Sequence, residues 1–166
     1  MASRIERISA LVTLLFFVSP YPVEAQVPDA IAAPNKTQVL KVLAEGAQIY
    51  ECMADKDGKL IWKFREPIAA LILDGKTIGR HFAGPTWELS DGSAVTGKVT
   101  ARNAGATSRD IPWLKLEAAT HRGSGQLSDA TAIQRINTNG GAIEGDCTAA
   151  GTLISVPYSS EYIFLK

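Results

Sequence analysis

The chain has 166 residues, which is room for a single domain with a short extension. Lys and Arg together number 17, as do Asp and Glu, so the formal net charge is zero; with no run of basic residues, nucleic acid is not expected as a partner. Hydrophobic residues make up 46% of the chain and charged residues 20%, a composition that excludes a largely disordered protein.

Residues 1–25 have the pattern of a secretory signal peptide. Two arginines precede an apolar stretch over 10–18, and the tripeptide before Gln26 gives a small-x-small cleavage pattern. The apolar stretch is shorter than the roughly 20 residues that a membrane-spanning helix needs, and no second stretch of this kind follows. We therefore expect a mature chain that is exported to the periplasm or the extracellular space and has no transmembrane segment. The alternative is an uncleaved N-terminal anchor.

Export changes the interpretation of the two cysteines, Cys52 and Cys147. In an oxidising compartment a lone pair of cysteines is expected to form a disulfide. The alternative is a reactive thiol or a metal ligand, but the Cys-x-x-Cys spacing typical of catalytic pairs is absent.

Residues 26–36 show little periodicity and are expected to lead into a single β domain over 37–166. Apolar and polar residues alternate over 60–65, 95–100 and 114–118, which is typical of half-buried strands. No stretch has a convincing helical period; the best helical candidate, 66–73, is short and is interpreted as a strand. The further strand candidates are 38–44, 48–53, 68–73, 77–82, 85–90, 129–137, 152–158 and 161–165.

Four dipeptides indicate hairpin turns, because both of their residues tolerate positive φ: Asp57-Gly58, Asp74-Gly75, Asp91-Gly92 and Asn139-Gly140. Together with the strand candidates they predict an all-β fold, an antiparallel meander of about ten short strands with one disulfide. Such a meander must hide its edges, either by closing into a barrel or by folding into a sandwich, and the sequence leaves both open.

Several separated segments resemble one family. The segment 79–93, GRHFAGPTWELSDGS, is similar to the signature of an exported family catalogued as domain of unknown function 3455. The resemblance covers about residues 37–164. It implies export and supports pairing of the two cysteines, but it does not imply any particular reaction. The other matching segments are 48–52, 62–64, 111–114, 133–141, 156–158 and Tyr162.

One interpretation of the two histidines, His81 and His121, is a zinc or copper site completed by Glu88 or Asp91. Each histidine lies in or just beyond an expected strand, but the close His-x-His spacing of strand-borne metal sites is absent. A histidine held by hydrogen bonds within the fold is the commoner arrangement, so no metal is expected.

Glu88 and Asp91 could form a carboxylate pair for acid–base chemistry, although Asp91 is better explained as the first residue of a turn. Trp87 is the aromatic residue best placed for a binding role, because it follows the bend expected at Gly84-Pro85. Arg135 interrupts an apolar alternation, so it is either paired inside the fold or displayed outside.

These features favour a non-enzymatic exported β domain that binds a small molecule, a glycan or a cell-envelope partner. The candidate ligand-binding residues are His81, Trp87, Glu88, His121 and Arg135, and the segment 137–141 is either a binding rim or a plain hairpin turn. The alternative is a metal-dependent or acid–base enzyme that uses the two histidines and Glu88; a purely structural envelope protein is the third hypothesis. No cofactor is expected, because neither a Gly-x-Gly-x-x-Gly motif nor a P-loop occurs.

Overall fold

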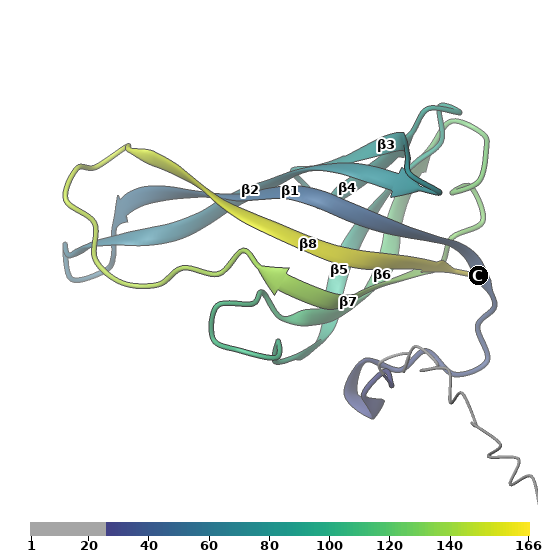
Figure 1. Cartoon of the computed structure of the whole chain (residues 1–166), viewed down its shortest axis with the longest axis horizontal. Helices are drawn as coiled ribbons and strands as arrows, with labels where there is room; N and C mark the ends of the chain where they lie inside the picture. The colour runs from purple at the N-terminus through teal and green to yellow at the C-terminus, as the bar shows by residue number, and fades with distance from the viewer. Residues whose placement is uncertain (1–25) are drawn as a thin grey trace, which may run out of the picture.

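The computed structural model describes residues 26–166, so the expected signal peptide lies outside the described residues. Eight antiparallel strands follow one another in chain order, each hydrogen-bonded to the next, and the last pairs with the first to close a barrel (Figure 1). The all-β fold is confirmed, and the sheet closes as a barrel rather than a sandwich. The strands are β1 (Gln38–Ala54), β2 (Leu60–Leu73), β3 (Lys76–Phe82), β4 (Thr86–Leu89), β5 (Ala94–Asn103), β6 (Trp113–Arg122), β7 (Ala132–Gly140) and β8 (Leu153–Leu165).

The eleven candidate segments, expected to give about ten strands, form eight, because three of the strands are long enough to contain two candidates each. β1 joins the candidates 38–44 and 48–53 across Gly46. A Cβ atom at Gly46 would collide with the backbone of β2 at Ile68, so this glycine permits close approach of two strands and does not end one. β2 and β8 likewise continue through the positions at which a break was expected.

Three of the four predicted hairpin dipeptides lie in turns between consecutive strands. Asp74 and Gly75 form a two-residue connection in which φ is positive at both residues, 49° and 75°, as a type I′ turn requires. The fourth prediction is wrong. Asn139 and Gly140 lie within β7 and pair with β8, after a register shift that begins at Ile136. The positive φ angles at Asn137 and Gly140 therefore belong to an irregularity within the strand. A sequence pattern does not distinguish such an irregularity from a turn.

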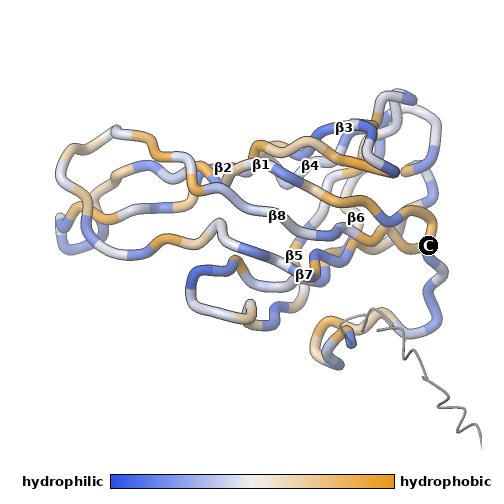
Figure 2. Tube along the Cα trace, viewed as in Figure 1, coloured by the Kyte–Doolittle hydropathy of each residue, from blue (hydrophilic) through white to orange (hydrophobic). Residues whose placement is uncertain are grey.

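One end of the barrel is closed by its own side chains. Alternate residues of every strand point inward and form the main hydrophobic core, and Leu127, from the loop between β6 and β7, is completely buried against them. Asp91 fastens this loop by accepting hydrogen bonds from the Gln126 backbone N–H and the Ser93 hydroxyl. Figure 2 shows apolar and polar residues interspersed along the barrel strands, and a further apolar stretch at η1.

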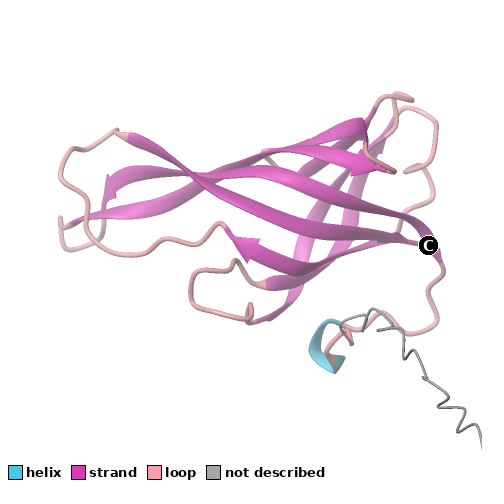
Figure 3. Ribbon diagram, in the orientation of Figure 1, coloured by secondary structure: helices cyan, strands magenta, loops and turns pink. Residues whose placement is uncertain are grey.

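The other end is open on one side because β1, β2 and β8 are longer than their neighbours. β3 stops pairing with β2 at Ala69, and β7 stops pairing with β8 at Tyr158. The remaining three-stranded extension, which we call the arm, comprises 46–54 of β1, 60–68 of β2 and 153–157 of β8 (Figure 3). Pro67 and Pro157 occupy the outer strands of the arm, where proline is tolerated.

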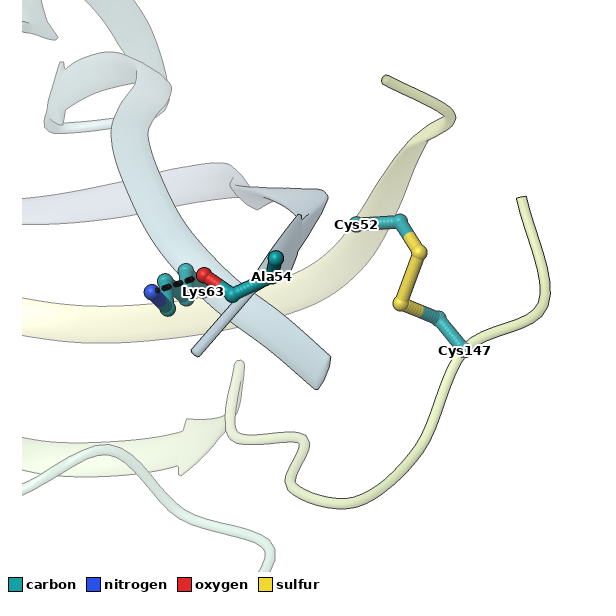
Figure 4. Close-up of a disulfide and its surroundings, with 4 residues drawn as sticks. All are labelled: Cys52, Ala54, Lys63 and Cys147. Carbon is teal, nitrogen blue, oxygen red and sulfur yellow. Dashed lines mark hydrogen bonds between the residues drawn. A yellow bond between two sulfur atoms is a disulfide. The ribbon is translucent and has the colours of Figure 1, made fainter. Parts of the chain in front are cut away.

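The predicted disulfide joins Cys52, near the tip of the arm, to Cys147 in the loop between β7 and β8 (Figure 4). Backbone hydrogen bonds between Cys52 and both Gly151 and Thr152 fix the same loop to β1. On the other side, the Lys63 ammonium of β2 donates to the Ala54 carbonyl, 2.7 Å away. The arm is therefore held at its tip as well as at its base.

The expected lead-in packs on the outside of the barrel. It contains the short 3-10 helix η1 (Asp29–Ile31), and Ile31 is completely buried in a second, smaller hydrophobic cluster with Ile136 and Ile163. The Gln134 side chain of β7 donates to the Ile31 carbonyl. Within 26–166 this three-residue element is the only helix, and it is too short to cross a membrane.

Candidate functional site

A cavity of about 370 Å³ occupies the open end of the barrel. Its lining includes two loops, at Gly84-Pro85 between β3 and β4 and at Ile111-Pro112 between β5 and β6. The arm supplies one wall, and there the Tyr50 ring meets the half-exposed Phe64 ring edge-on at 5.8 Å. Its volume lies within the roughly 300–1,000 Å³ of small-molecule sites, and barrel mouths are a common place for such sites.

Three aromatic side chains form the inner surface of this cavity. The His81 imidazole stacks on the Trp87 indole with 4.6 Å between ring centroids, and Tyr162 meets both rings edge-on. The stacking follows from the sheet register, since His81 and Trp87 are direct cross-strand partners on β3 and β4. Trp87 is only 1% exposed, so the predicted aromatic candidate lies at the inner end of the cavity.

His81 carries no charge at neutral pH. Burial lowers its pKa to about 3, outweighing the hydrogen bond to the Thr86 carbonyl, and the positive charge of Arg135 acts in the same direction as burial. In the neutral ring, Nδ1 donates to the Thr86 carbonyl oxygen at 2.9 Å, which leaves Nε2 as an acceptor. His81 is thus a neutral polar surface and not a proton donor at physiological pH.

Several buried polar atoms around the cavity lack a hydrogen-bond partner. Trp87 Nε1, Gln48 Nε2 and the Tyr162 hydroxyl are all shielded from solvent and are not satisfied by the protein. Gln48 and Tyr162 interact with the neighbouring Tyr158 hydroxyl, which is also buried, so Trp87 Nε1 is the clearest unpaired donor of the group. Burial, followed by the neighbouring Tyr162, raises the pKa of Tyr158 far above its ordinary value. These atoms have essentially no accessible surface, so they lie behind the cavity wall and are not exposed to its interior.

Arg135 lies at the mouth of the cavity, between Leu114 and Tyr162 in the sheet register. Its Nε and Nη2 atoms both donate to the Pro112 carbonyl, at 3.1 and 2.8 Å. Among residues 26–166, no carboxylate lies within ion-pair distance of this guanidinium, although Arg65 on the opposite wall is paired with Glu66. The sequence left open whether Arg135 is paired inside or displayed outside; it is half-buried and bound to a backbone carbonyl.

A second, more open groove of about 420 Å³ lies on the outer face of β3 to β6 and contains the remaining candidates, Glu88 and His121. Glu88 is held by Arg80 at 2.8 Å and by Arg122 at 3.1 Å. The hydrogen bond from Arg80, reinforced by both positive charges, lowers the pKa of Glu88. The His121 Nε2 atom lies 2.7 Å from the Ala130 carbonyl oxygen. This groove is a paired polar surface.

The structure therefore divides the five candidate residues between two faces of the barrel wall. His81, Trp87 and Arg135 line the cavity, whereas Glu88 and His121 line the outer groove. Three strand spacings separate the backbones of the two histidines, since the register runs from His81 through β4 and β5 to His121, and at about 4.8 Å per spacing this is roughly 14 Å. Within 26–166, no cluster of three or more His, Cys, Asp or Glu side chains could hold a metal ion.

Gln48 was not among the candidate residues predicted from the sequence, although the alternation of residues around it indicates a buried position. Gln48, Tyr50 and Cys52 alternate in β1, and all three side chains are buried. A polar residue in phase with two buried ones points into the barrel, so its amide must find a partner there. Tyr162 was not among the candidate residues predicted from the sequence, because its contacts with His81 and Trp87 depend on barrel closure.

Comparison with known proteins gives one family. The model of a family described as protein of unknown function (DUF3455) matches residues 32–166, nearly the whole described chain, so the chain belongs to that family. The resemblance inferred from its separated motifs is thereby confirmed. Neither a curated protein nor a solved structure matches the chain.

Proposed function

We propose that this member of the family is an exported, non-catalytic protein that binds a small molecule inside the open end of its barrel. The observation that carries the proposal is the cavity at the open end of the barrel, whose lining includes Trp87, His81 and Tyr162. Rigid aromatic walls with a few polar groups are typical of small-molecule sites. Because the cavity recedes into the barrel, we favour an enclosed small molecule over a glycan or an envelope surface.

The enzyme alternative gains no support from the same geometry. Acid–base chemistry with His81 and Glu88 would need both groups at one reacting centre. Glu88 pairs across the sheet with Arg80, one position along from the pair that His81 makes with Trp87, so the two groups face opposite sides of the wall. A histidine with a pKa of about 3 is also a poor base at neutral pH.

Export is part of the proposal. The N-terminal sequence pattern supports it, and the disulfide between Cys52 and Cys147 is typical of oxidising compartments. Expression of the full chain followed by cell fractionation and N-terminal sequencing tests it. We expect a mature protein that begins at Gln26 outside the cytoplasm; a full-length chain retained in the cytoplasm would contradict export.

Binding is tested with N-phenylnaphthylamine, a neutral dye that fluoresces in apolar surroundings. We expect saturable fluorescence enhancement with the wild-type protein and a loss of it in Val99→Phe, which fills the cavity from β5. Lys98→Phe is the matched control, because it places the same ring on the exposed face of the same strand. No saturable enhancement, or equal enhancement in Val99→Phe, would refute binding inside the barrel.

A further inference from the structure

The cavity differs from an ordinary apolar pocket in one respect. Hydrogen-bond donors and positive charge predominate among the polar groups of its lining. Three arginines, Arg65, Arg102 and Arg135, line the cavity, and no Asp or Glu is among its lining residues. A guanidinium has N–H donors and no acceptor, so a ligand that pairs with these arginines must bring acceptors.

Among the three arginines, the charge of Arg135 is the one left uncompensated next to the aromatic walls. Arg65 is paired with Glu51 and Glu66, and Arg102 lies exposed at the rim. Arg135 uses only two of its donors on a neutral carbonyl, which leaves the others available.

The positive field of Arg135 reaches across the cavity. It lowers the pKa of His81 and opposes the effect of burial on Tyr50 and Tyr158. Glu144 is the carboxylate that acts on Tyr50, but it is exposed and its effect on the pKa of Tyr50 is smaller than that of Arg135. His81 and the two tyrosines are neutral, so none of them compensates the guanidinium.

The rest of the cavity suits an apolar body. Leu114, Leu116 and Val99 form the wall provided by β5 and β6, and Pro85 lies at the rim. A Cβ atom at Gly97 would come within 3.1 Å of both Trp87 and Leu116, so this glycine provides room for the indole between two strands. Apolar side chains thus surround the space between the Trp87 indole and the charged mouth.

We propose that the cavity binds a small amphipathic monocarboxylate, with its carboxylate on the free donors of Arg135 and its apolar body against Trp87 and Leu116. This inference rests on the proposed function and narrows it to one ligand class. Guanidinium–carboxylate pairs are stronger than neutral hydrogen bonds, and in a half-buried site the difference is at least about tenfold in affinity. An aliphatic and an aromatic acid share this chemistry, so the experiment tests both.

The test is isothermal titration of the mature protein with two nearly isosteric pairs, decanoate against decanamide and cinnamate against cinnamamide, at neutral pH. We expect one of the acids to bind at least about tenfold more tightly than its amide. Whichever pair shows the preference identifies the body as aliphatic or aromatic. Equal affinities of acid and amide in both pairs would overturn the inference, and this comparison needs no variant.

Arg135→Gln is expected to abolish the preference for the acid while leaving amide binding unchanged, because glutamine can still donate to the Pro112 carbonyl. Arg135→Lys, which keeps the charge, should retain part of the preference. Arg109→Gln is the matched control, since it removes an exposed charge that does not line the cavity. A preference that survives in Arg135→Gln would overturn the assignment.

The outcomes separate the two proposals. Binding of N-phenylnaphthylamine and of both amides, without preference for the acids, would refute the carboxylate inference and leave the proposed function standing. Absence of binding by the dye and by all four compounds would refute both.

Discussion

Because His81 is buried, the stability of the barrel depends on pH even above the range in which the carboxylates of the protein titrate. His81 is 2% exposed, and burial lowers its pKa from 6.5 to about 3. Above pH 6.5 the imidazole is neutral in both the folded and the unfolded chain, so it contributes no pH dependence. Below that value the unfolded chain binds a proton that the folded chain refuses, so stability falls as the pH decreases towards about 3.

The size of this effect follows from the width of the interval. Each unit between the two pKa values is worth about 1.4 kcal/mol, so the full loss is roughly 5 kcal/mol and about 2 kcal/mol has been lost near pH 5. Asp91 and Asp110 have pKa values lowered by hydrogen bonds, from Ser93 and from the Gly140 N–H respectively. Their contribution to stability is lost only at lower pH, so the interval from about pH 6.5 to 5 is left to histidine.

Urea unfolding followed by tryptophan fluorescence at a series of pH values measures this dependence. His81→Gln, which can still donate to the Thr86 carbonyl but cannot be protonated, should be less stable at pH 7 yet lose almost nothing between about pH 6.5 and 5. His121→Gln is the matched control and should keep the wild-type slope, because His121 is exposed. The reasoning fails if the wild-type protein is equally stable at both pH values, or if His81→Gln retains the wild-type slope.

Three further substitutions test other parts of the fold by urea unfolding. Replacing Cys52 and Cys147 together by alanine should cost about 4–5 kcal/mol, because the bond closes a loop with a sequence separation of 95; a loss below about 1 kcal/mol would contradict the chain-entropy argument. Ile31→Ala should cost about 3 kcal/mol, since this side chain is completely buried on the outside of the barrel, whereas a neutral result would mean that the lead-in does not stay docked. Asp91→Asn should lower the free energy of unfolding by about 1 kcal/mol at neutral pH and leave it unchanged at an acidic pH at which the native carboxylate is protonated. An equal loss of stability at neutral and at acidic pH would show that the charge of Asp91 does not hold the loop that contains Gln126.

Local alternation predicts much of this fold because strands have a period of two. The positions of Trp87 inside and Glu88 outside follow from that period, and so does the buried phase of β1 that contains Gln48. Adjacent residues of a strand face opposite sides of the sheet, so the same period predicts that Trp87 and Glu88 do not belong to one site.

What alternation cannot supply is the register between strands. His121 reaches the outer groove only after register shifts in the β5–β6 pairing, between Thr96 and Gly97 and again between Val99 and Ala101. Such irregularities arise from the closure of the whole barrel and leave no reliable mark in the sequence. Asn139-Gly140 is the converse case, where a dipeptide with a strong turn pattern lies in a strand. Barrel and sandwich likewise differ only in whether β1 meets β8, which is a contact between the two ends of the domain.

The cavity is a consequence of unequal strand lengths. An eight-stranded barrel encloses a space that side chains can just fill, and Leu127 and its neighbours do fill the closed end. At the open end β4 has only four residues while β1 has 17, so inward-facing residues of the arm have no opposite wall to pack against. The lining of this space includes the side chains of Trp87, Gln48 and Tyr162. A bound ligand should therefore raise the unfolding temperature with its concentration, and the rise should be absent in Val99→Phe, where the space itself has been filled.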